Sequence, residues 1–455
     1  MRYYTSLLLL GVSMLSSALC APPDGAGLLL ISIDGLNPNY VTHADRYGLK
    51  IPNLRRILRD GSHASGVRGV LPTVTYPTHT TMLTGVLPAK HGIHSNVTFD
   101  PTRANLGGWY WYSEDVKSPT LWQAAAEAGY VVGSVAWPVS VGAKGVQYLI
   151  PEYWRAMTTE DDVKLLRALS SPGLLSEFEK VHGKYIIDLD NATPGDWMRT
   201  RYAASIIREK RARLLTIHMA SLDHIEHATG PGTAEGFAAL EEVDKMVGVL
   251  EEAIRSVARN AAVCVLSDHG MARVEHELNL NMAFVKAGLI TLGSEGSPVR
   301  GPAITAWTAQ PWVAGGSAAI VLKDAGDQDT VKKVEQLLKD LAADPANGIA
   351  AILDKKAIMD LGGSPRASFW VDMKPGFAVG AAMTGALTRA VSVRGTHGYS
   401  PTQNEMRASF FIAGPGIQKG TDIGEIEIRR VAPTLARQLG VSLPSADLKP
   451  LEIFE

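Results

Sequence analysis

GLLLISID, residues 27–34, is a continuous apolar run of strand length that ends on an acidic residue, Asp34. Apolar runs without polar alternation are typical of strands buried on both faces, as in parallel sheets. Similar runs occur at YVVGSVAW (130–137), RLLTIHMA (213–220) and AAVCVLSD (261–268). These four segments predict a mostly parallel central sheet.

Helix-forming segments alternate with these strands. They are IPNLRRILRDG (51–61), SPTLWQAAAEAG (118–129) with Ser118 as its cap, GDWMRTRYAASIIREKR (195–211) and GTAEGFAALEEVDKMVGVLEEAIRSVARN (232–260). Alternation of strand and helix predicts an α/β fold with helices on both faces of the sheet. A core strand, ASFFIAGPGI (408–417), and a helix, RRVAPTLARQLG (429–440), are expected to close the fold.

Composition and charge are those of an ordinary globular protein. The 455 residues are 46% hydrophobic and 20% charged, with a formal net charge of -2, which argues against binding a nucleic-acid polymer through a basic surface. Residues 274–390 are rich in Gly and Ala and less regular in pattern, so we expect an inserted cap region there. One domain over 21–455 with this subdomain is favoured over two independent domains.

The N-terminal stretch MRYYTSLLLLGVSMLSSALCA has the pattern of a signal peptide over residues 1–20. The pattern predicts export to the periplasm or the medium, and no transmembrane span in the mature chain. Lipid attachment at Cys20 is the alternative, although Leu19 is larger than the residue usual at that position. Cys264 is the other cysteine, so the mature chain is expected to lack an intramolecular disulfide.

Three acidic residues lie at or just beyond the ends of predicted strands: Asp34, Asp223 and Asp268. In open α/β sheets, ligands bind outside the carboxyl ends of the strands. Three carboxylates at one edge repel one another unless a cation lies among them. The sequence therefore predicts a metal site at this edge.

Three histidines accompany these carboxylates. His227 lies four residues after Asp223, His269 follows Asp268, and His397 lies in the glycine-flanked loop VRGTHGYS. Mixed imidazole and carboxylate ligands suit zinc better than magnesium or calcium, which prefer oxygen ligands. Taken alone, each of these motifs has an ordinary alternative, such as a surface helix pair or a capping turn. A metal site is favoured because all of them fall at strand ends or in glycine-marked loops.

A threonine-rich segment, LPTVTYPTHTTMLTG (71–85), precedes a predicted helix. Proline is favoured in a first helical turn, so the helix is expected to begin near Pro77. Thr75 then lies at the positive end of the helix, where a phosphate oxygen is attracted. The alternative is that Thr75 only caps the helix.

These segments together resemble a known family. The motifs are ISIDG with Asp34, VTYPTH with Thr75, LTGVLPAKHGIHSNVTFDP with Asn96, the pair Asp223 and His227, SDHGM, and GTHGY, in that order. The order is similar to that of the nucleotide pyrophosphatase/phosphodiesterase family of the alkaline phosphatase superfamily. The resemblance covers roughly residues 27–417 and implies an alkaline-phosphatase-like fold.

The resemblance also implies a site with two zinc ions. One zinc would be held by Asp223, His227 and His397. The other would be held by Asp34, Asp268, His269 and the nucleophile Thr75. Asn96, which also fits a glycosylation sequon, would lie near a non-bridging phosphate oxygen, and the amide of Tyr76 would donate a hydrogen bond to the same oxyanion.

Substrate binding departs from the family pattern at one position. Many nucleotide-cleaving members have a base-stacking tyrosine where this chain has His218. Aromatic pocket walls are expected instead from Tyr76, Trp109 and Trp111. The resemblance implies hydrolysis of a small phosphodiester or nucleotide pyrophosphate through a covalent threonine. A phosphomonoesterase and an inactive metal-stabilised binding protein are the alternatives.

Overall fold

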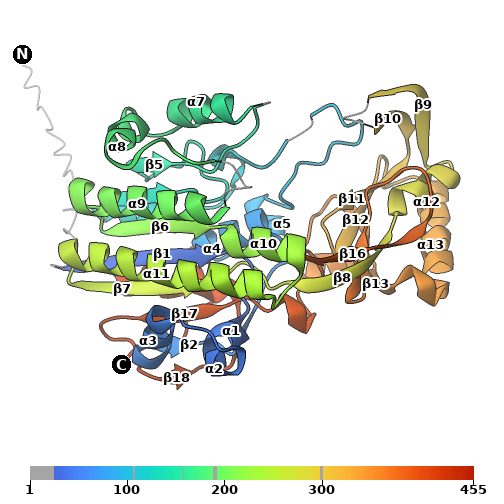
Figure 1. Cartoon of the computed structure of the whole chain (residues 1–455). Coiled ribbons are helices and arrows are strands. Elements are labelled where there is room, and N and C mark those ends of the chain that lie inside the picture. Colours follow the sequence, from blue (N-terminus) through green and yellow to red (C-terminus); the bar gives the residue numbers. More distant parts are fainter. Residues whose placement is uncertain (1–24, 106–107, 157, 188–191, 298–300) are drawn as a thin grey trace, which may run out of the picture.

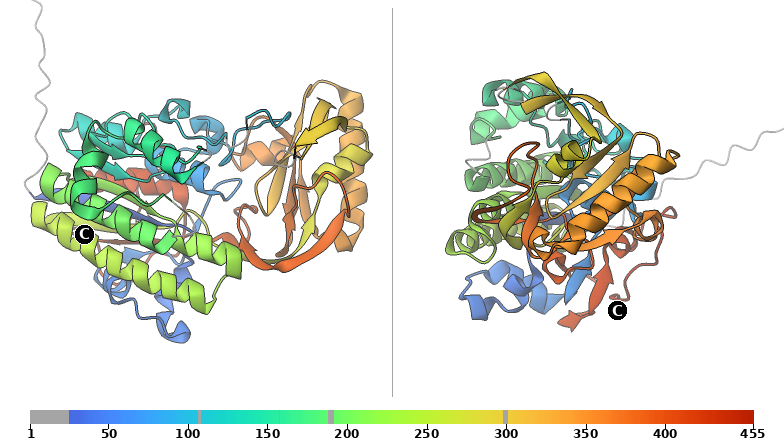
Figure 2. Two further views of the ribbon diagram at one scale, coloured as in Figure 1. Left: turned by 45° about the horizontal axis from the view of Figure 1, so that its top comes forward. Right: turned by 90° about the vertical axis from the view of Figure 1, so that its right-hand side faces the viewer.

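A computed structural model describes residues 25–105, 108–156, 158–187, 192–297 and 301–455. The predicted signal peptide and Cys20 lie outside the described residues. The chain forms a larger α/β lobe, and a smaller lobe built from the segment between β8 (Ala272–Leu278) and β16 (Thr388–Thr396) (Figures 1 and 2).

The larger lobe is built on an eight-stranded sheet. Its order is β18 (Thr421–Asp422), β2 (Ser62–His63), β17 (Phe410–Ala413), β7 (Asn260–Leu266), β1 (Ala26–Ile33), β6 (Leu214–Met219), β4 (Val132–Val135) and β5 (Tyr148–Ile150). The strands from β7 to β5 are parallel, whereas β17 runs antiparallel to β7. The predicted α/β class with a mostly parallel sheet is confirmed.

Helices cover both faces of this sheet (Figure 1). Successive side chains of a strand point to opposite faces, and β1 accordingly divides its apolar residues between two cores. Leu29, Ile31 and Ile33 pack with α3 (Pro52–Asp60), α9 (Ala192–Lys210) and α11 (Ala234–Val257). Leu28 and Leu30 pack with α4 (Thr75–Thr84), α6 (Leu121–Glu127) and α15 (Val431–Leu439).

The cap of α6 differs from the prediction. Thr120, and not Ser118, is the N-cap. The Thr120 hydroxyl accepts a hydrogen bond from the Gln123 amide, and the Gln123 side chain accepts one from the Thr120 amide at 3.0 Å. This reciprocal capping box satisfies two amides that the first turn leaves unpaired, so the helix begins at Leu121.

The smaller lobe is more regular than its Gly and Ala content indicates. It contains a four-stranded sheet, β11 (Ala309–Val313), β12 (Ser317–Leu322), β14 (Ala367–Met373) and β13 (Ile349–Leu353), and a three-stranded sheet, β15 (Gly376–Val379), β8 and β16. A hairpin of β9 (Ile290–Ser297) and β10 (Gly301–Trp307) and the helices α12 (Leu280–Lys286), α13 (Gln328–Ala343) and α14 (Lys355–Asp360) complete it. Its role as a cap stays a prediction.

The remaining elements connect these layers. They are α1 (Pro38–Thr42), α2 (Ala44–Tyr47), β3 (Gly66–Arg68), α5 (Pro88–His91), η1 (Ser113–Asp115), α7 (Thr159–Leu169), α8 (Leu174–His182), α10 (Ser221–Thr229), η3 (Pro345–Asn347), η4 (Asn404–Met406), β19 (Glu425–Glu427) and η5 (Ile428–Arg430). Within the described parts of the chain, no helix combines the length and apolarity needed to cross a bilayer. Cys264 is a buried free thiol in β7.

The smaller lobe is tied directly to the loop that carries His397. Asp372 of β14 accepts hydrogen bonds from the Ser400 amide and from Gln403 Nε2, both at 2.8 Å. The Gly316 amide donates to the carbonyl of His397 at 2.8 Å. These contacts fix the backbone on both sides of Gly398, whose φ of +85 and tight packing leave no room for a side chain.

Asp372→Asn tests the electrostatics of this connection. Burial raises the pKa of Asp372 to about 6, so the folded state binds the carboxyl proton more tightly than the unfolded chain does. Ionisation of Asp372 therefore destabilises the fold as the pH rises from about 4 to about 6. Relative to wild type, the unfolding free energy of the variant should increase by about 2 kcal/mol between about pH 4 and pH 7. Thermal unfolding across this pH range measures it, and a difference independent of pH would contradict the assignment.

Candidate metal centre

The carboxyl ends of three parallel strands deliver the predicted site residues to one edge of the sheet. Asp34 follows β1 directly, and Asp268 comes two residues after β7. Helix α10 begins two residues after β6 and carries Asp223 and His227 one turn apart. His397 arrives from the other side, immediately after β16. The carboxylates therefore lie at the edge of the sheet at which the sequence placed them.

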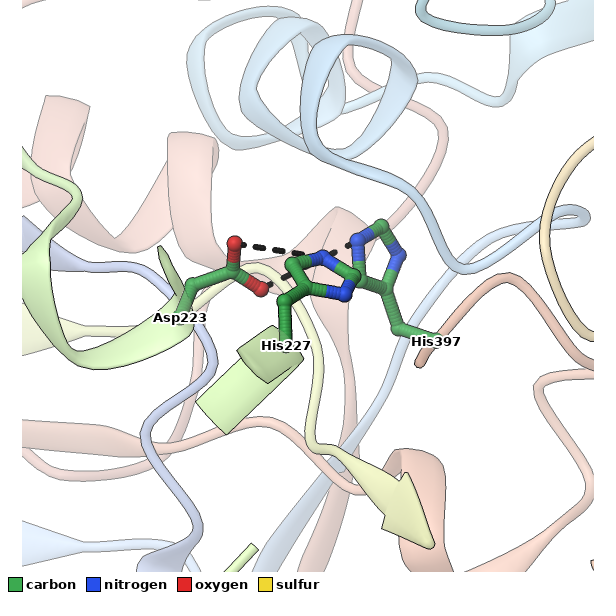
Figure 3. A group of neighbouring side chains, drawn as sticks. All are labelled: Asp223, His227 and His397. Atoms are coloured by element: carbon green, nitrogen blue, oxygen red, sulfur yellow. Dashed lines mark ion pairs between the residues drawn. The ribbon is translucent and has the colours of Figure 1, made fainter. Parts of the chain in front are cut away.

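The first ligand group contains Asp223, His227 and His397, whose donor atoms all lie within 4.8 Å of one another. The two oxygens of Asp223 face different rings: Oδ2 is 3.3 Å from His227 Nε2, and Oδ1 is 3.8 Å from His397 Nε2. Figure 3 shows the three side chains converging in this way. A single cation between them could contact all three.

The second ligand group contains Asp34, Asp223 and His269. His269 Nε2 lies 3.4 Å from Asp34 Oδ1 and 3.1 Å from Asp268 Oδ2. Asp223 belongs to both groups, and the imidazoles of His269 and His397 stack with their centroids 3.6 Å apart. The two candidate ligand groups are therefore adjacent and share Asp223; the second contains Asp223 where the sequence predicted Asp268, which lies beside it at His269.

Backbone carbonyls orient all three imidazoles. Nδ1 of His227 lies 3.0 Å from the carbonyl oxygen of Gly395, Nδ1 of His269 lies 3.1 Å from that of Gly270, and Nδ1 of His397 lies 3.2 Å from that of Thr73. A carbonyl can only accept, so each Nδ1 donates its proton there and Nε2 faces the carboxylates. Imidazoles that ligate metals are usually held by such an outer hydrogen bond.

One oxygen of each carboxylate is buried without a hydrogen-bond partner. These atoms are Asp34 Oδ1, Asp223 Oδ1 and Asp268 Oδ2. Unpaired buried polar atoms are uncommon in folded proteins, and a bound cation would satisfy all three. The combination of carboxylate oxygen and imidazole nitrogen fits zinc.

The electrostatics of the cluster also favour a cation. Burial, together with the charges of Asp223 and Asp268, raises the pKa of Asp34 well above its usual value. Burial lowers the pKa of His269, but the carboxylates of Asp268 and Asp34 outweigh it and raise the value to about 9. Burial and the neighbouring His269 lower the pKa of His397. The cluster thus holds excess negative charge that a divalent ion would neutralise.

Thr75 lies beside this cluster at the start of α4. The helix begins at Thr75, so Pro77 lies in its first turn as predicted, and its N-cap is Val74. The alternative that Thr75 caps the helix is therefore wrong. The Thr75 hydroxyl oxygen lies 3.5 Å from His269 Nε2, so the hydroxyl faces the ligand groups.

The predicted oxyanion donors are close together. The Tyr76 amide donates to Asn96 Oδ1 at 2.9 Å, so Asn96 is fixed beside the first turn of α4. The aromatic residues differ in exposure: Trp109 is half-buried, whereas Tyr76 and Trp111 are completely buried. Tyr76 and Trp111 therefore have no exposed ring surface in this structure, and the substrate-binding roles of Tyr76, Trp109 and Trp111 stay predictions.

His218 and Glu152 form a polar connection that sequence reasoning missed. His218 is 3% exposed, and its ring nitrogens lie 3.0 Å from Asp34 Oδ2 and 3.0 Å from Glu152 Oε2. A ring this buried offers no stacking surface to a base. Glu152 follows β5 by two residues, at the same sheet edge, and that position was a signal that could have identified it.

Two further buried residues, Asp196 and His79, support the site, and His79 Nδ1 lies 3.8 Å from Asp268 Oδ2. Asp196 of α9 accepts hydrogen bonds from the amides of Ala220 and Ser221, at 3.2 and 2.8 Å, where α10 begins. His79 lies 2.8 Å from the Thr75 carbonyl and 2.8 Å from the Ser32 hydroxyl. Burial lowers the pKa of His79 to about 3, so its ring is neutral.

Comparison with known families identifies the class. The sequence profile of the family described as "Type I phosphodiesterase / nucleotide pyrophosphatase" matches residues 28–400. This covers most of the chain, so the protein belongs to that family, within the alkaline phosphatase superfamily. The predicted family is confirmed.

Individual relatives are distant. Ectonucleotide pyrophosphatase/phosphodiesterase family member 3 of Bos taurus is 29% identical over 266 residues, which is 55% of this chain and 26% of the relative. Venom phosphodiesterase 2 of Crotalus adamanteus is 28% identical over 258 residues, 54% of this chain and 26% of the relative. The matched region thus spans about a quarter of the length of these curated relatives.

Solved structures share the fold. Human ectonucleotide pyrophosphatase/phosphodiesterase 5 has a TM-score of 0.63 at 19% identity, and the match covers 91% of this chain and 95% of that one. An inactive form of the murine protein in complex with AMP also has a TM-score of 0.63 and 19% identity, and covers 92% and 96%. These similarities confirm the alkaline-phosphatase-like architecture.

Asp223→Ala tests the metal centre. Because Asp223 belongs to both ligand groups, its loss should lower the zinc bound per chain by more than half, as measured by elemental analysis after gel filtration. His224→Ala is the matched control on the same helix, since His224 belongs to neither group. Unchanged zinc content in Asp223→Ala would remove this residue from the ligand set.

Proposed function

We propose that the protein is a two-zinc hydrolase that cleaves small phosphodiesters or nucleotide pyrophosphates, with Thr75 as a covalent nucleophile. The observation that carries this proposal is the position of the Thr75 hydroxyl, 3.5 Å from His269 Nε2 and beside the two ligand groups. The names of the relatives, pyrophosphatases and phosphodiesterases, support the reaction class.

The chemistry needs an activated hydroxyl. Bound zinc ions would supply it by lowering the pKa of a hydroxyl and by offsetting charge on phosphate oxygens. Thr75 Oγ1 gives up its proton and attacks phosphorus in line, forming a new O–P bond as the bond to the leaving oxygen breaks. The leaving oxygen takes a proton. Water then attacks phosphorus from the side that the leaving group vacated and loses a proton, the Thr75 O–P bond breaks, and Thr75 Oγ1 takes up a proton.

Residues around the nucleophile stabilise the charge that develops on phosphorus oxygens. Thr75 lies at the first position of α4, where the helix amides and dipole attract negative charge. Asn96 and the amide of Tyr76 are the proposed hydrogen-bond donors to the oxyanion. Since these two groups bond to each other in this structure, a phosphate oxygen would replace that contact.

The alternatives are less well supported. A phosphomonoesterase would use the same nucleophile, but the family description and the relatives' names point to diesters and pyrophosphates. An inactive metal-stabilised binding protein would have no need of a hydroxyl facing the ligand groups. Export to the periplasm or the medium is part of the proposal and rests on the pattern of residues 1–20.

The ratio of diesterase to monoesterase activity tests the substrate class. The purified protein should cleave an aryl phosphodiester at least about ten times faster, in kcat/KM, than the matching aryl phosphomonoester, a difference of about 1.4 kcal/mol. Removing zinc with a chelator should abolish both rates, and adding zinc should restore them. A monoester rate equal to or above the diester rate would favour the phosphomonoesterase.

Thr75→Ala tests the covalent route. Turnover should fall by at least about a thousandfold, because the nucleophile is lost, while bound zinc should change little because the carboxylates and imidazoles remain. Thr78→Ala is a matched control: Thr78 is on the same helix, and its hydroxyl donates to the Val74 carbonyl. Near-normal diesterase activity in Thr75→Ala would exclude a threonine intermediate.

A further inference from the structure

Asp34 is held differently from the other two carboxylates of the metal centre. Its Oδ2 lies 3.0 Å from His218 Nε2, while its Oδ1 is buried without a hydrogen-bond partner and lies 3.4 Å from His269 Nε2. One oxygen is thus secured from outside the cluster, and the other faces the ligand position. The orientation of Asp34 depends on what holds His218.

The sheet register brings His218 to this position. His218 of β6 pairs with Ser32 of β1, two residues before Asp34. Its ring also packs edge-on against the ring of His79, with centroids 4.6 Å apart. The strand pairing and the His79 ring therefore restrict where the His218 ring can lie. The ring could still rotate about its side-chain bonds unless its second nitrogen, Nδ1, were also held.

Glu152 removes that freedom. Its Oε2 lies 3.0 Å from His218 Nδ1, so both ring nitrogens face carboxylate oxygens. Its other oxygen, Oε1, accepts a hydrogen bond from the Tyr76 hydroxyl at 2.9 Å. Both ring nitrogens of His218 are thus held by carboxyl oxygens, and the ring is fixed between Glu152 and Asp34.

Glu152 itself is kept charged by its surroundings. Its side chain is 12% exposed. Burial favours the neutral acid, but the hydrogen bond from His218 and the charge of Arg199 outweigh it and lower the pKa of Glu152. Arg199 in turn pairs with Asp196, with 2.7 Å between Nη1 and Oδ1, and Asp196 caps the start of α10. Buried charges of alternating sign thus run from α10 to Asp34.

We infer that Glu152 is a positioning residue that acts through His218 to hold Asp34 in the orientation required for binding zinc. The inference rests on the two-zinc centre of the proposed function. A ligand that is already oriented loses less freedom when the metal binds, and outer hydrogen bonds of this kind typically change metal affinity by about 10- to 100-fold. Glu152 contacts neither ligand group directly; its contacts are to His218 and Tyr76.

Glu152→Gln in the full-length protein tests this role. The substitution keeps the size of the side chain, and removes the negative charge that fixes His218. Zinc affinity, measured by competition with a chromophoric chelator, should weaken by about 10- to 100-fold for one of the two ions. Diesterase activity should fall at limiting zinc and recover substantially at saturating zinc. Zinc affinity equal to that of wild type would overturn the inference.

Glu251→Gln is the matched control. Glu251 is also a buried carboxylate, 6% exposed, and its partners Arg56 and Arg255 lie outside the ligand groups. This variant should lose stability but keep wild-type zinc affinity, which separates a positioning effect from the general loss of a buried charge. Weakening of zinc binding to the same degree in both variants would assign Glu152 a purely structural role.

A second variant keeps the test independent of one substitution. His218→Asn removes the ring that connects Glu152 with Asp34, and should weaken zinc binding to the same degree as expected for Glu152→Gln. It therefore tests the inference also in the case that Glu152→Gln does not fold. The wild-type protein and Asp223→Ala separate the two levels of the proposal. Absence of zinc binding by wild type would overturn the proposed function and this inference together. A different result would overturn this inference alone: wild type binds zinc, Asp223→Ala binds it more weakly, and Glu152→Gln and His218→Asn bind it as wild type does.

Discussion

The mutual repulsion of Asp34, Asp223 and Asp268 is the constraint on which the site depends. The three carboxylates lie at one edge of the sheet, and each has a buried oxygen without a hydrogen-bond partner. Burial of like charges is strongly unfavourable unless a cation compensates it. The imidazole of His269, whose pKa the carboxylates raise to about 9, compensates part of this charge in the protein alone. Two divalent ions would compensate the rest.

The architecture makes this concentration of charge possible. Parallel strands end at the same edge, so β1 and β7 deliver two carboxylates, and α10 delivers the third with a histidine one turn later. The smaller lobe contributes His397 through β16, and β14 fixes the loop that follows through Asp372. Thr75, the proposed nucleophile, enters from a separate segment, at the first residue of α4. The site is thus a junction of the central sheet with the inserted segment.

Much of this could be predicted from sequence, because parallel strands leave a local signal. The apolar runs that end in Asp34 and Asp268 indicated both the strands and the edge. Other features left a weak local signal or none: Glu152 follows a strand of only three residues, and His218 lies inside an apolar run. The exact first residue of α4 was not predicted, for a related reason. The proline in its first turn fixes only that the helix has begun, not at which residue.

The sequence by itself determined the α/β class, the family and the set of candidate metal-ligating residues, because these depend on local apolar runs and on motifs in a given order. Only the tertiary structure decided which oxygen of Asp34 faces the ligand position, that the ring of Trp111 is buried, and that Glu152 and His218 stand behind Asp34. The physical reason is that these features depend on sheet register and side-chain packing between segments more than sixty residues apart in the chain, as the separation of 66 between Glu152 and His218 illustrates.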